Sequence, residues 1–226
     1  MQSAKARGIR LIVALTNNWS DYGGIDVYVS ALGCANHGAF YTDSRCISGF
    51  QTYIRNFVGR YKDEPTILAW ELANEPRCKG SNGGEGSCTA ATITQWATTI
   101  SQFIKSIDSN HLVALGDEGF YQGGDSSGGY PYNAGEGIDF VANLRISSLD
   151  FGTVHMYPDV SPILQWRMAR NEYVLLTSCW DKQHWGQESN SQAWGVKWIN
   201  DHAANQKSAN KPVLLGEQLF FIYLPR

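Results

Sequence analysis

Two glutamates occur where a predicted buried strand ends and a loop begins. Glu75 lies in the stretch WELANEPR (residues 70–77), and the proline after it cannot continue a strand ladder. Glu217 ends the apolar stretch LLGE (residues 214–217). Two carboxyl groups about 5–5.5 Å apart can cleave a glycosidic bond with retention, one as acid/base and one as nucleophile. The alternative interpretation of Glu75 is a capping or salt-bridged residue beside Arg77.

The elements that must position these glutamates alternate along the chain. Five short apolar runs predict strands, at 9–15, 67–72, 112–115, 151–155 and 212–216. Four amphipathic segments predict helices, at 48–61, 93–107, 138–146 and 194–204. This alternation predicts an α/β fold with a parallel sheet, either doubly wound or a (β/α)8 barrel. No G-x-G-x-x-G follows the first strand, which argues against a dinucleotide site.

Polar residues gather immediately after the predicted strands. They are Asn17, Asn74, Glu75, Asp117, Glu118, His155, Tyr157 and Glu217. In a barrel of parallel strands the carboxyl ends of all strands meet at one rim, which is where such folds carry their chemistry. We therefore expect these side chains to share one site.

The composition excludes several classes of protein. The 226 residues suffice for one core, and 43% hydrophobic with 17% charged residues is typical of a globular chain. A net charge of −3 argues against nucleic acid as a partner. No apolar run approaches the roughly 20 residues of a membrane helix. No His, Asp or Glu cluster has the spacing of metal ligands along the sequence, and we expect neither metal nor cofactor.

The cysteines predict an oxidising environment. Cys34 and Cys46 share one stretch rich in Gly, Asn and Ser, and Cys78 and Cys88 share another. Neither pair has the C-x-x-C spacing of a zinc or redox motif, so two short loop-closing disulfides are the better interpretation. Cys179 is then left unpaired. Asn18-Trp19-Ser20 is a formal glycosylation sequon, but its place in the predicted cleft argues against a glycan.

Four longer motifs carry a family resemblance. They are NNWSDYGG (17–24), WELANEPRC (70–78), LGDEG (115–119) and FGTVHMYP (151–158). In this order they resemble the fungal-type endo-β-1,4-mannanases of glycoside hydrolase family 5, a (β/α)8 family with retaining chemistry. The similarity covers residues 1–159 and resumes from about Trp185 to Glu217.

The resemblance implies a role for each candidate site residue. Glu75 is expected to be the general acid/base and Glu217 the nucleophile, with Asn74 bonding the sugar 2-hydroxyl. Tyr157 and His155 are expected beside Glu217, and Trp19, Arg77 and Glu118 on the leaving-group side of the cleft. One carboxyl should stay protonated while the other is ionised, because proximity separates their pKa values.

Simpler interpretations exist for some of these residues. His155 could be a satisfied core histidine, Trp19 could serve packing alone, and Arg77 could neutralise the rim. We expect His37, His111 and His202 to be structural.

The chain also departs from the family pattern. Residues 1–8 read as the end of a helix, so we expect an incomplete barrel with about strands 3–7 present and strands 1, 2 and 8 missing. Residues 160–184, which include Cys179, look like a foreign insertion in a single partial catalytic domain (1–226), and 218–226 like a non-family tail. A retained intron or a genuine cleft lid would explain the insertion. We expect the chain as written to fold poorly and to be weakly active.

The leading hypothesis is a secreted, monomeric, cofactor-free endo-β-1,4-mannanase acting on plant mannans. A cellulase-like β-glycanase of the same family is the alternative among enzymes, because both substrates offer a 2-hydroxyl to Asn74. A non-catalytic remnant that at most binds sugar is the alternative of another class.

Overall fold

The structure is a computed structural model of the chain, and it describes residues 1–20, 23–123, 131–156 and 191–218. Its sheet is parallel. Strands β1 (Leu11–Ala14), β2 (Ile67–Glu71) and β3 (Leu112–Ala114) pair in that order, and β4 (Gly152–Met156) pairs with β5 (Val213–Gln218). An isolated parallel bridge between Ala114 and Phe151 joins the two groups. Spatial order therefore follows chain order, as in a βα-barrel wall.

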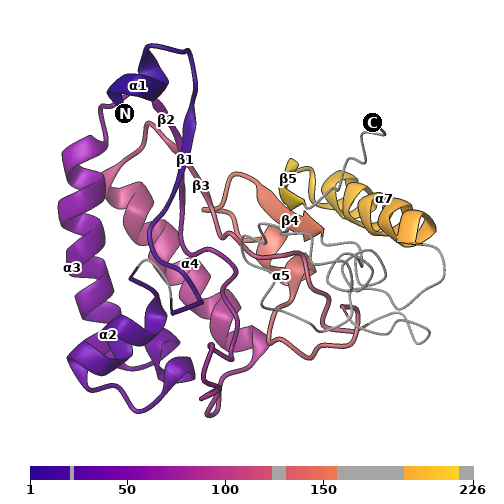
Figure 1. Ribbon diagram of the computed structural model, residues 1–226, viewed down its shortest axis with the longest axis horizontal. Coiled ribbons are helices and arrows are strands. Elements are labelled where there is room, and N and C mark those ends of the chain that lie inside the picture. Colours follow the sequence, from indigo (N-terminus) through magenta and orange to yellow (C-terminus); the bar gives the residue numbers. More distant parts are fainter. Residues whose placement is uncertain (21–22, 124–130, 157–190, 219–226) are drawn as a thin grey trace, which may run out of the picture.

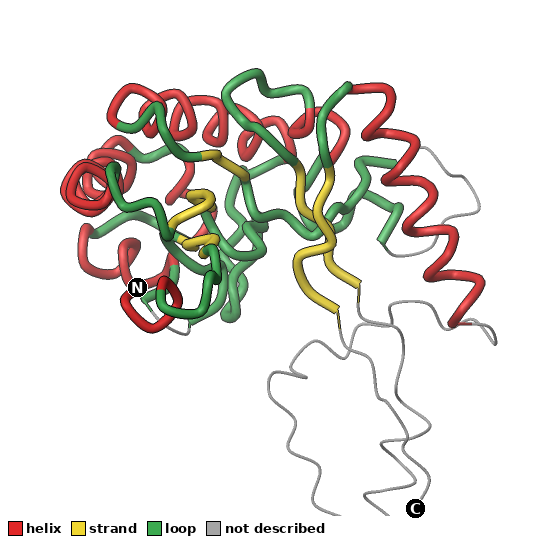
Figure 2. Tube along the Cα trace, turned by 90° about the horizontal axis from the view of Figure 1, so that it is seen from above, coloured by secondary structure: helices red, strands yellow, loops and turns green. Residues whose placement is uncertain are grey.

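Helices surround these strands on the outside. They are α1 (Gln2–Lys5), α2 (Ile25–Leu32), the 3-10 helix η1 (His37–Tyr41), α3 (Ser44–Tyr61), α4 (Ala90–Ile107), α5 (Phe140–Leu144) and α7 (Ser191–Ala209). Helices α3 and α4 lie side by side next to β1–β3, and α7 lies beside the β4–β5 pair (Figure 1). From above, the strands lie between the N-terminal helices and α7 (Figure 2).

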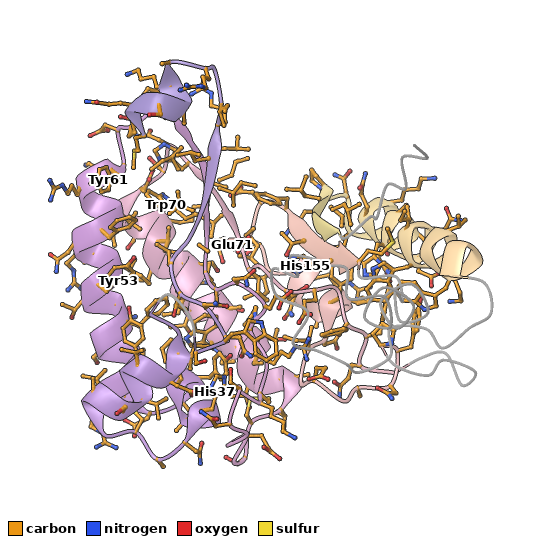
Figure 3. All side chains as sticks on the ribbon, in the orientation of Figure 1. His37, Tyr53, Tyr61, Trp70, Glu71 and His155 are labelled. Carbon is orange, nitrogen blue, oxygen red and sulfur yellow. A yellow bond between two sulfur atoms is a disulfide. The ribbon has the colours of Figure 1, made fainter. Side chains whose placement is uncertain are left out.

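The core forms where the helices meet the sheet. One face of α3 buries Phe50, Ile54 and Val58, spaced as a helical stripe requires. Tyr53 and Tyr61 lie along the same helix (Figure 3). The Phe57 ring lies between them in sequence, with its centre 5.5 Å from that of Tyr53 and 5.2 Å from that of Tyr61. Trp70 of β2 packs edge-on against Phe57 and is fully buried. The helices are thereby fixed against the middle strand of the first sheet.

The other face of the sheet is open in the described part of the chain. Ile12 of β1 and Leu112 of β3 are both in register with Ala69 of β2, so all three point to one side. Ile12, Leu112 and Leu214 are 36%, 40% and 42% exposed. A closed barrel would bury such residues. The described strands thus form an open arc of a barrel wall.

Most predicted elements are confirmed, with shifted boundaries. The strand predicted at 9–15 is Leu11–Ala14, and that predicted at 212–216 is β5, Val213–Gln218. The helices predicted from residues 48 and 93 begin earlier, because Asp43 caps Ser44–Tyr61 and a Thr89–Thr92 capping box starts Ala90–Ile107.

Other helix predictions differ more from the structure. The helix predicted at 138–146 is shorter, whereas that predicted at 194–204 extends over Ser191–Ala209. The sequence analysis missed α2 and η1, which lie in the loop-like stretch after β1. No helix in the described residues is long and apolar enough to span a membrane.

Both predicted disulfides are present. Cys34 bonds Cys46 and Cys78 bonds Cys88, closing separations of 12 and 10 residues. The first ties the end of α2 to the start of α3, and the second closes the loop that follows Arg77. Cys179 lies outside the described residues.

Candidate active site

The polar loops after the strands are hydrogen-bonded to one another at the rim. Asn17 bridges Asn74 in parallel fashion, and the Asn18 amide donates to the Asn74 carbonyl at 2.9 Å. The Glu75 amide donates to Gly116 at 2.9 Å, and the His155 amide to Glu118 at 3.1 Å. The ladder therefore continues past the strands and carries the polar side chains onto one arc.

Gly116 makes this close approach possible. Its φ is +91°, and a Cβ there would lie 2.0 Å from the carbonyl oxygen of Ala73. Only glycine tolerates that combination of backbone conformation and contact. The loop after β3 can thus lie directly against the loop that carries Glu75.

Glu75 is buried and held in an unusual backbone conformation. It is 7% exposed, and its φ of +50° lies in the left-handed region that a glutamate seldom adopts. One carboxyl oxygen lies 2.6 Å from the Trp19 Nε1 donor, and the other lies 2.8 Å from His155 Nδ1. His155 lies on β4 (Figure 3), so its contact with Glu75 joins β4 to the loop after β2. Backbone strain of this kind concentrates at functional sites, because surrounding contacts must sustain it.

The surroundings of Glu75 act on its ionisation in opposite directions. Burial raises the pKa of the carboxyl, whereas the His155 and Trp19 hydrogen bonds and the charges of His155 and Arg77 lower it; the net pKa is lowered. A general acid requires the opposite direction. The described contacts therefore favour the ionised form of Glu75, whereas the side chain of Glu217, its expected partner carboxyl, lies outside the described residues.

Arg77 joins three loops. Its Nε and NH2 donate to the two oxygens of Glu118 at 2.7 Å each, and NH1 lies 3.0 Å from Glu136. The guanidinium lies 5.0 Å from the centre of the Trp19 ring and 4.9 Å from that of Phe120. Arg77 is only 4% exposed. This planar donor fork therefore fixes the relative positions of the loops after β1, β2 and β3.

Glu118 illustrates the crowding of carboxyl groups at the rim. Burial raises its pKa to about 8; the Arg77 charge lowers it and the Glu75 charge raises it. The bidentate contact with Arg77 uses both oxygens as acceptors and so favours the ionised form, against the effect of burial. Neighbouring Asp117 is also buried, and burial raises its pKa to about 6.

Three ligand-type side chains also come together in space. One potential ligand atom from each of Glu75, Glu118 and His155 lies within 4.8 Å of the others. The sequence analysis did not foresee this cluster, because its members come from the loops after β2 and β3 and from strand β4. Their oxygens already contact Trp19, His155 and Arg77, and a cation would have to displace the guanidinium. The donor set therefore suits an ion-pair network better than a metal site.

The structure brings together most of the predicted site residues. Trp19, Glu75, Arg77, Glu118 and His155 are in contact, and Asn74 Nδ2 donates to Asn17 at 3.2 Å. His155 and Trp19 are thus more than packing residues. Glu217 lies on β5 in register with His155 on β4. The Glu217 side chain and the whole of Tyr157 lie outside the described residues.

The three other histidines have structural contacts, as expected. His37 contacts Asp26 and Asn18, His111 contacts Asp108, and His202 contacts the Gly119 carbonyl. The sequence analysis missed Glu136 and Phe120 as partners of Arg77 and missed the burial of Asn18, which is 0% exposed. The NNW motif itself was the signal for Asn18, since it places an amide directly before Trp19.

Comparisons with known proteins agree on one family. The family model described as Cellulase (glycosyl hydrolase family 5) matches residues 1–218. Mannan endo-1,4-beta-mannosidase A of Podospora anserina is 44% identical over 217 residues, which cover 96% of this chain and 48% of that protein. Its counterpart from Hypocrea jecorina is 43% identical, with 96% and 41% covered.

A solved structure shows the same likeness. The endo-1,4-beta-mannanase from Rhizomucor miehei superposes with a TM-score of 0.78 at 43% identity, covering 96% of this chain and 56% of that one. The chain spans about half the length of the relatives it matches.

Proposed function

Because the chain belongs to glycosyl hydrolase family 5, we propose that it contributes the catalytic wall of a retaining endo-β-1,4-mannanase. The observation that carries the proposal is the pairing at the rim. Glu75 lies buried at φ +50°, bonded to His155, and His155 is in register with Glu217 on the next strand. Two carboxyl-bearing positions therefore lie on either side of His155, and a double displacement requires two such groups close to each other.

In this mechanism Glu75 protonates the leaving glycosidic oxygen and later activates water. Glu217 attacks the anomeric carbon and forms a glycosyl-enzyme. A neighbouring carboxylate within about 4–6 Å raises the pKa of a carboxyl group, so ionised Glu217 would oppose the lowering of the Glu75 pKa by His155 and Trp19. After the glycosyl-enzyme forms, that negative charge is lost and Glu75 more readily gives up its proton to act as base.

The rest of the site suits a polysaccharide cleft. Asn74 would bond the sugar 2-hydroxyl, and Tyr157 would lie beside Glu217. Trp19 is half-buried, and its exposed part offers an aromatic surface on the leaving-group side. Arg77 and Glu118 are nearly saturated by their own contacts, which supports a role in shaping that wall.

The substrate class is part of the proposal. The relatives with about 40% identity are named mannan endo-1,4-beta-mannosidases, which supports plant β-mannan over other β-glycans. The family model is described as Cellulase, so a cellulase-like β-glycanase is the second candidate. A remnant that only binds sugar is the third, favoured by the open sheet face at Ile12 and Leu112.

The proposal extends to the domain organisation, secretion and oligomeric state of the chain. Residues 1–226 would form a single partial (β/α)8 domain carrying about strands 3–7, with an insertion at 160–184 and a non-family tail at 218–226. The two disulfides support secretion. We propose a monomer that needs no cofactor.

The test is hydrolysis of β-mannan and of carboxymethyl cellulose by the purified protein and its Glu75→Gln variant. We expect mannan to be cleaved preferentially and Glu75→Gln to lose about 10²–10⁴-fold in kcat/KM. Glu64→Gln is the matched control, because Glu64 lies before the same strand at its opposite end and caps Thr66. Unchanged turnover in Glu75→Gln would refute the acid/base role, and cleavage of cellulose alone would select the second candidate.

A further inference from the structure

Asn18 is a buried junction between the loops after β1 and β2. Its Oδ1 accepts the Arg77 amide at 3.0 Å, and its Nδ2 donates to the Lys79 carbonyl at 3.2 Å. Those two contacts fix which end of the amide is oxygen. His37 Nε2 lies 3.0 Å from the same oxygen and donates a hydrogen to it. At 0% exposure the side chain has no water to replace these partners.

His37 extends this junction outward. Its Nδ1 lies 2.7 Å from Asp26 Oδ1 on α2, and the ring is 3% exposed. Gly80 packs so closely on the ring that a Cβ there would lie 2.3 Å from Nδ1. Asp26 and His37 also line a surface hollow of about 380 Å³ with Asn82, Gly83 and Gly84. The contacts from Asp26 through His37 to Asn18 thus run from the protein surface to the buried rim.

Asn18, the innermost of these three residues, is linked to the groups around Glu75. Trp19 directly follows Asn18 and donates to Glu75 at 2.6 Å. The Arg77 amide bonds to Asn18, and the Arg77 guanidinium lies 5.0 Å from the Trp19 ring centre. A shift of Asn18 would therefore move both groups relative to the Glu75 carboxyl. Asn18 itself is too deeply buried to reach substrate.

We propose that Asn18, His37 and Asp26 form a positioning chain that holds Trp19 and Arg77 against Glu75. The inference rests on the proposed function, because it assigns the chain an effect on turnover by Glu75. A chain of this kind acts on kcat more than on KM, since it sets the geometry of the proton donor, whereas of the expected sugar contacts it reaches only the exposed part of Trp19. The burial of the Asn18 side chain also argues against a glycan on the Asn18-Trp19-Ser20 sequon.

A second Asp–His pair provides a matched control. His111 Nδ1 lies 2.6 Å from Asp108, and its Nε2 lies 3.1 Å from the Glu64 carbonyl. His111 is 7% exposed, close to the value for His37, but it lies before β3, at the opposite end of the strands from Glu75. A purely structural role of His37 would make its replacement, like that of His111, lower stability without changing kcat.

The experiment compares His37→Ala, His37→Gln, Asn18→Ala and His111→Gln. We expect kcat on mannan to fall about 10–100-fold in His37→Ala and Asn18→Ala, with KM little changed. Gln can present an amide N–H near the position of Nε2, so His37→Gln should recover much of the loss. His111→Gln should lower the melting temperature without changing kcat. Because Asn18→Ala leaves two buried donors unpaired, the milder His37→Gln is measured in parallel.

A spectroscopic readout separates this inference from the proposed function. The Trp19 indole N–H, identified by its absence in Trp19→Phe, should resonate downfield because of its 2.6 Å hydrogen bond. We expect it to move upfield in His37→Ala and Asn18→Ala but not in His111→Gln. Unchanged indole signals in folded His37→Ala, or losses of kcat that only match the unfolded fraction, would overturn the positioning chain. If the wild-type protein is inactive but the Trp19 indole signal still moves in His37→Ala and Asn18→Ala, the proposed function is refuted and the positioning chain stands.

Discussion

The two ends of the parallel strands both bury charged groups, but they do so differently. Before β3, Asp108 accepts hydrogen bonds from Trp70 at 2.7 Å and from the amides of Asn110 and His111, and it contacts the His111 ring at 2.6 Å. After the strands, Glu118 and Glu136 both depend on Arg77, with Glu75 close by. One carboxylate has many donors at the first end, whereas several carboxyl groups share one cation at the second.

The pKa directions express this difference. Burial raises the pKa of Asp108, but its four hydrogen bonds outweigh that effect and lower it overall. At the rim, burial raises the pKa of Glu118 to about 8 and that of Asp117 to about 6. A carboxyl group whose folded pKa is raised contributes less to stability at neutral pH than at acidic pH. The rim therefore holds buried carboxyl groups at a cost in stability, and perturbed pKa values of this kind occur at functional sites and in structural ion-pair networks alike.

Removing the shared cation should have the largest effect. Arg77→Met leaves Glu118 and Glu136 without their guanidinium, and we expect the free energy of unfolding to fall by about 3–5 kcal/mol. Urea denaturation measures this loss. Arg55→Met is the control, since Arg55 is exposed and lies over Phe103 at 5.2 Å; a change within about 0.5 kcal/mol is expected there. Equal losses of unfolding free energy in Arg77→Met and Arg55→Met would show that the rim carboxyl groups do not depend on Arg77.

Crowding of the rim backbone should give the next largest effect. Gly116→Ala meets the Ala73 carbonyl at a φ of +91°, and we expect a loss of about 1–3 kcal/mol. Gly59→Ala should have the opposite sign, because Gly59 lies within α3 with ordinary contacts, and alanine gains about 0.5–1 kcal/mol there. Thermal melts of both variants test the pair. A stabilised Gly116→Ala would show that the close approach of the two loops is wrong.

The Asp108 site should affect stability without affecting chemistry. In Asp108→Asn, an amide replaces the carboxylate that accepts from Trp70 and contacts the His111 ring, so acceptor capacity is lost. We expect the free energy of unfolding to fall by about 1–3 kcal/mol with kcat unchanged. The folded-state pKa of Asp108 is lowered, so its contribution is present above the unfolded pKa and is lost as pH falls. The variant and wild type should therefore converge in stability on acidification. A reduced kcat in a fully folded variant would contradict the separation of the two ends.

The smallest effect concerns the pH dependence of stability at the rim. The pKa of Asp117 is raised to about 6, so its folded form binds more protons than the unfolded chain between its unfolded value of about 4 and that pKa. Its contribution is fully present below that window and decreases as pH rises through it. Asp117→Asn should remove this decrease, as measured by urea denaturation at several pH values. An unchanged slope would show that Asp117 does not titrate as a buried group.

Local patterns in the sequence were sufficient for most of the secondary structure. The stripe Phe50, Ile54 and Val58 predicts a buried helix face, because its spacing depends only on helical geometry. The helix ends were less predictable, since Asp43 and Thr89 begin helices several residues before the apolar periodicity starts. Helices α2 and η1 were missed because Gly, Asn and Cys around them suggest a loop; their packing against α3 is a tertiary effect.

By itself the sequence determined which residue types stand at the strand ends: Asn74-Glu75 before Pro76, Asp117-Glu118 after β3, and His155 on β4. Only the tertiary structure decided which of them touch. Glu75 meets Trp19 and His155 from 56 and 80 residues away, and Arg77 meets Glu118 across 41 residues. Such contacts depend on strand order, register and the φ of single residues such as Gly116 and Glu75, none of which leaves a periodic pattern in the chain. The pairing of acids with their donors, and hence their ionisation, is therefore a property of the assembled rim.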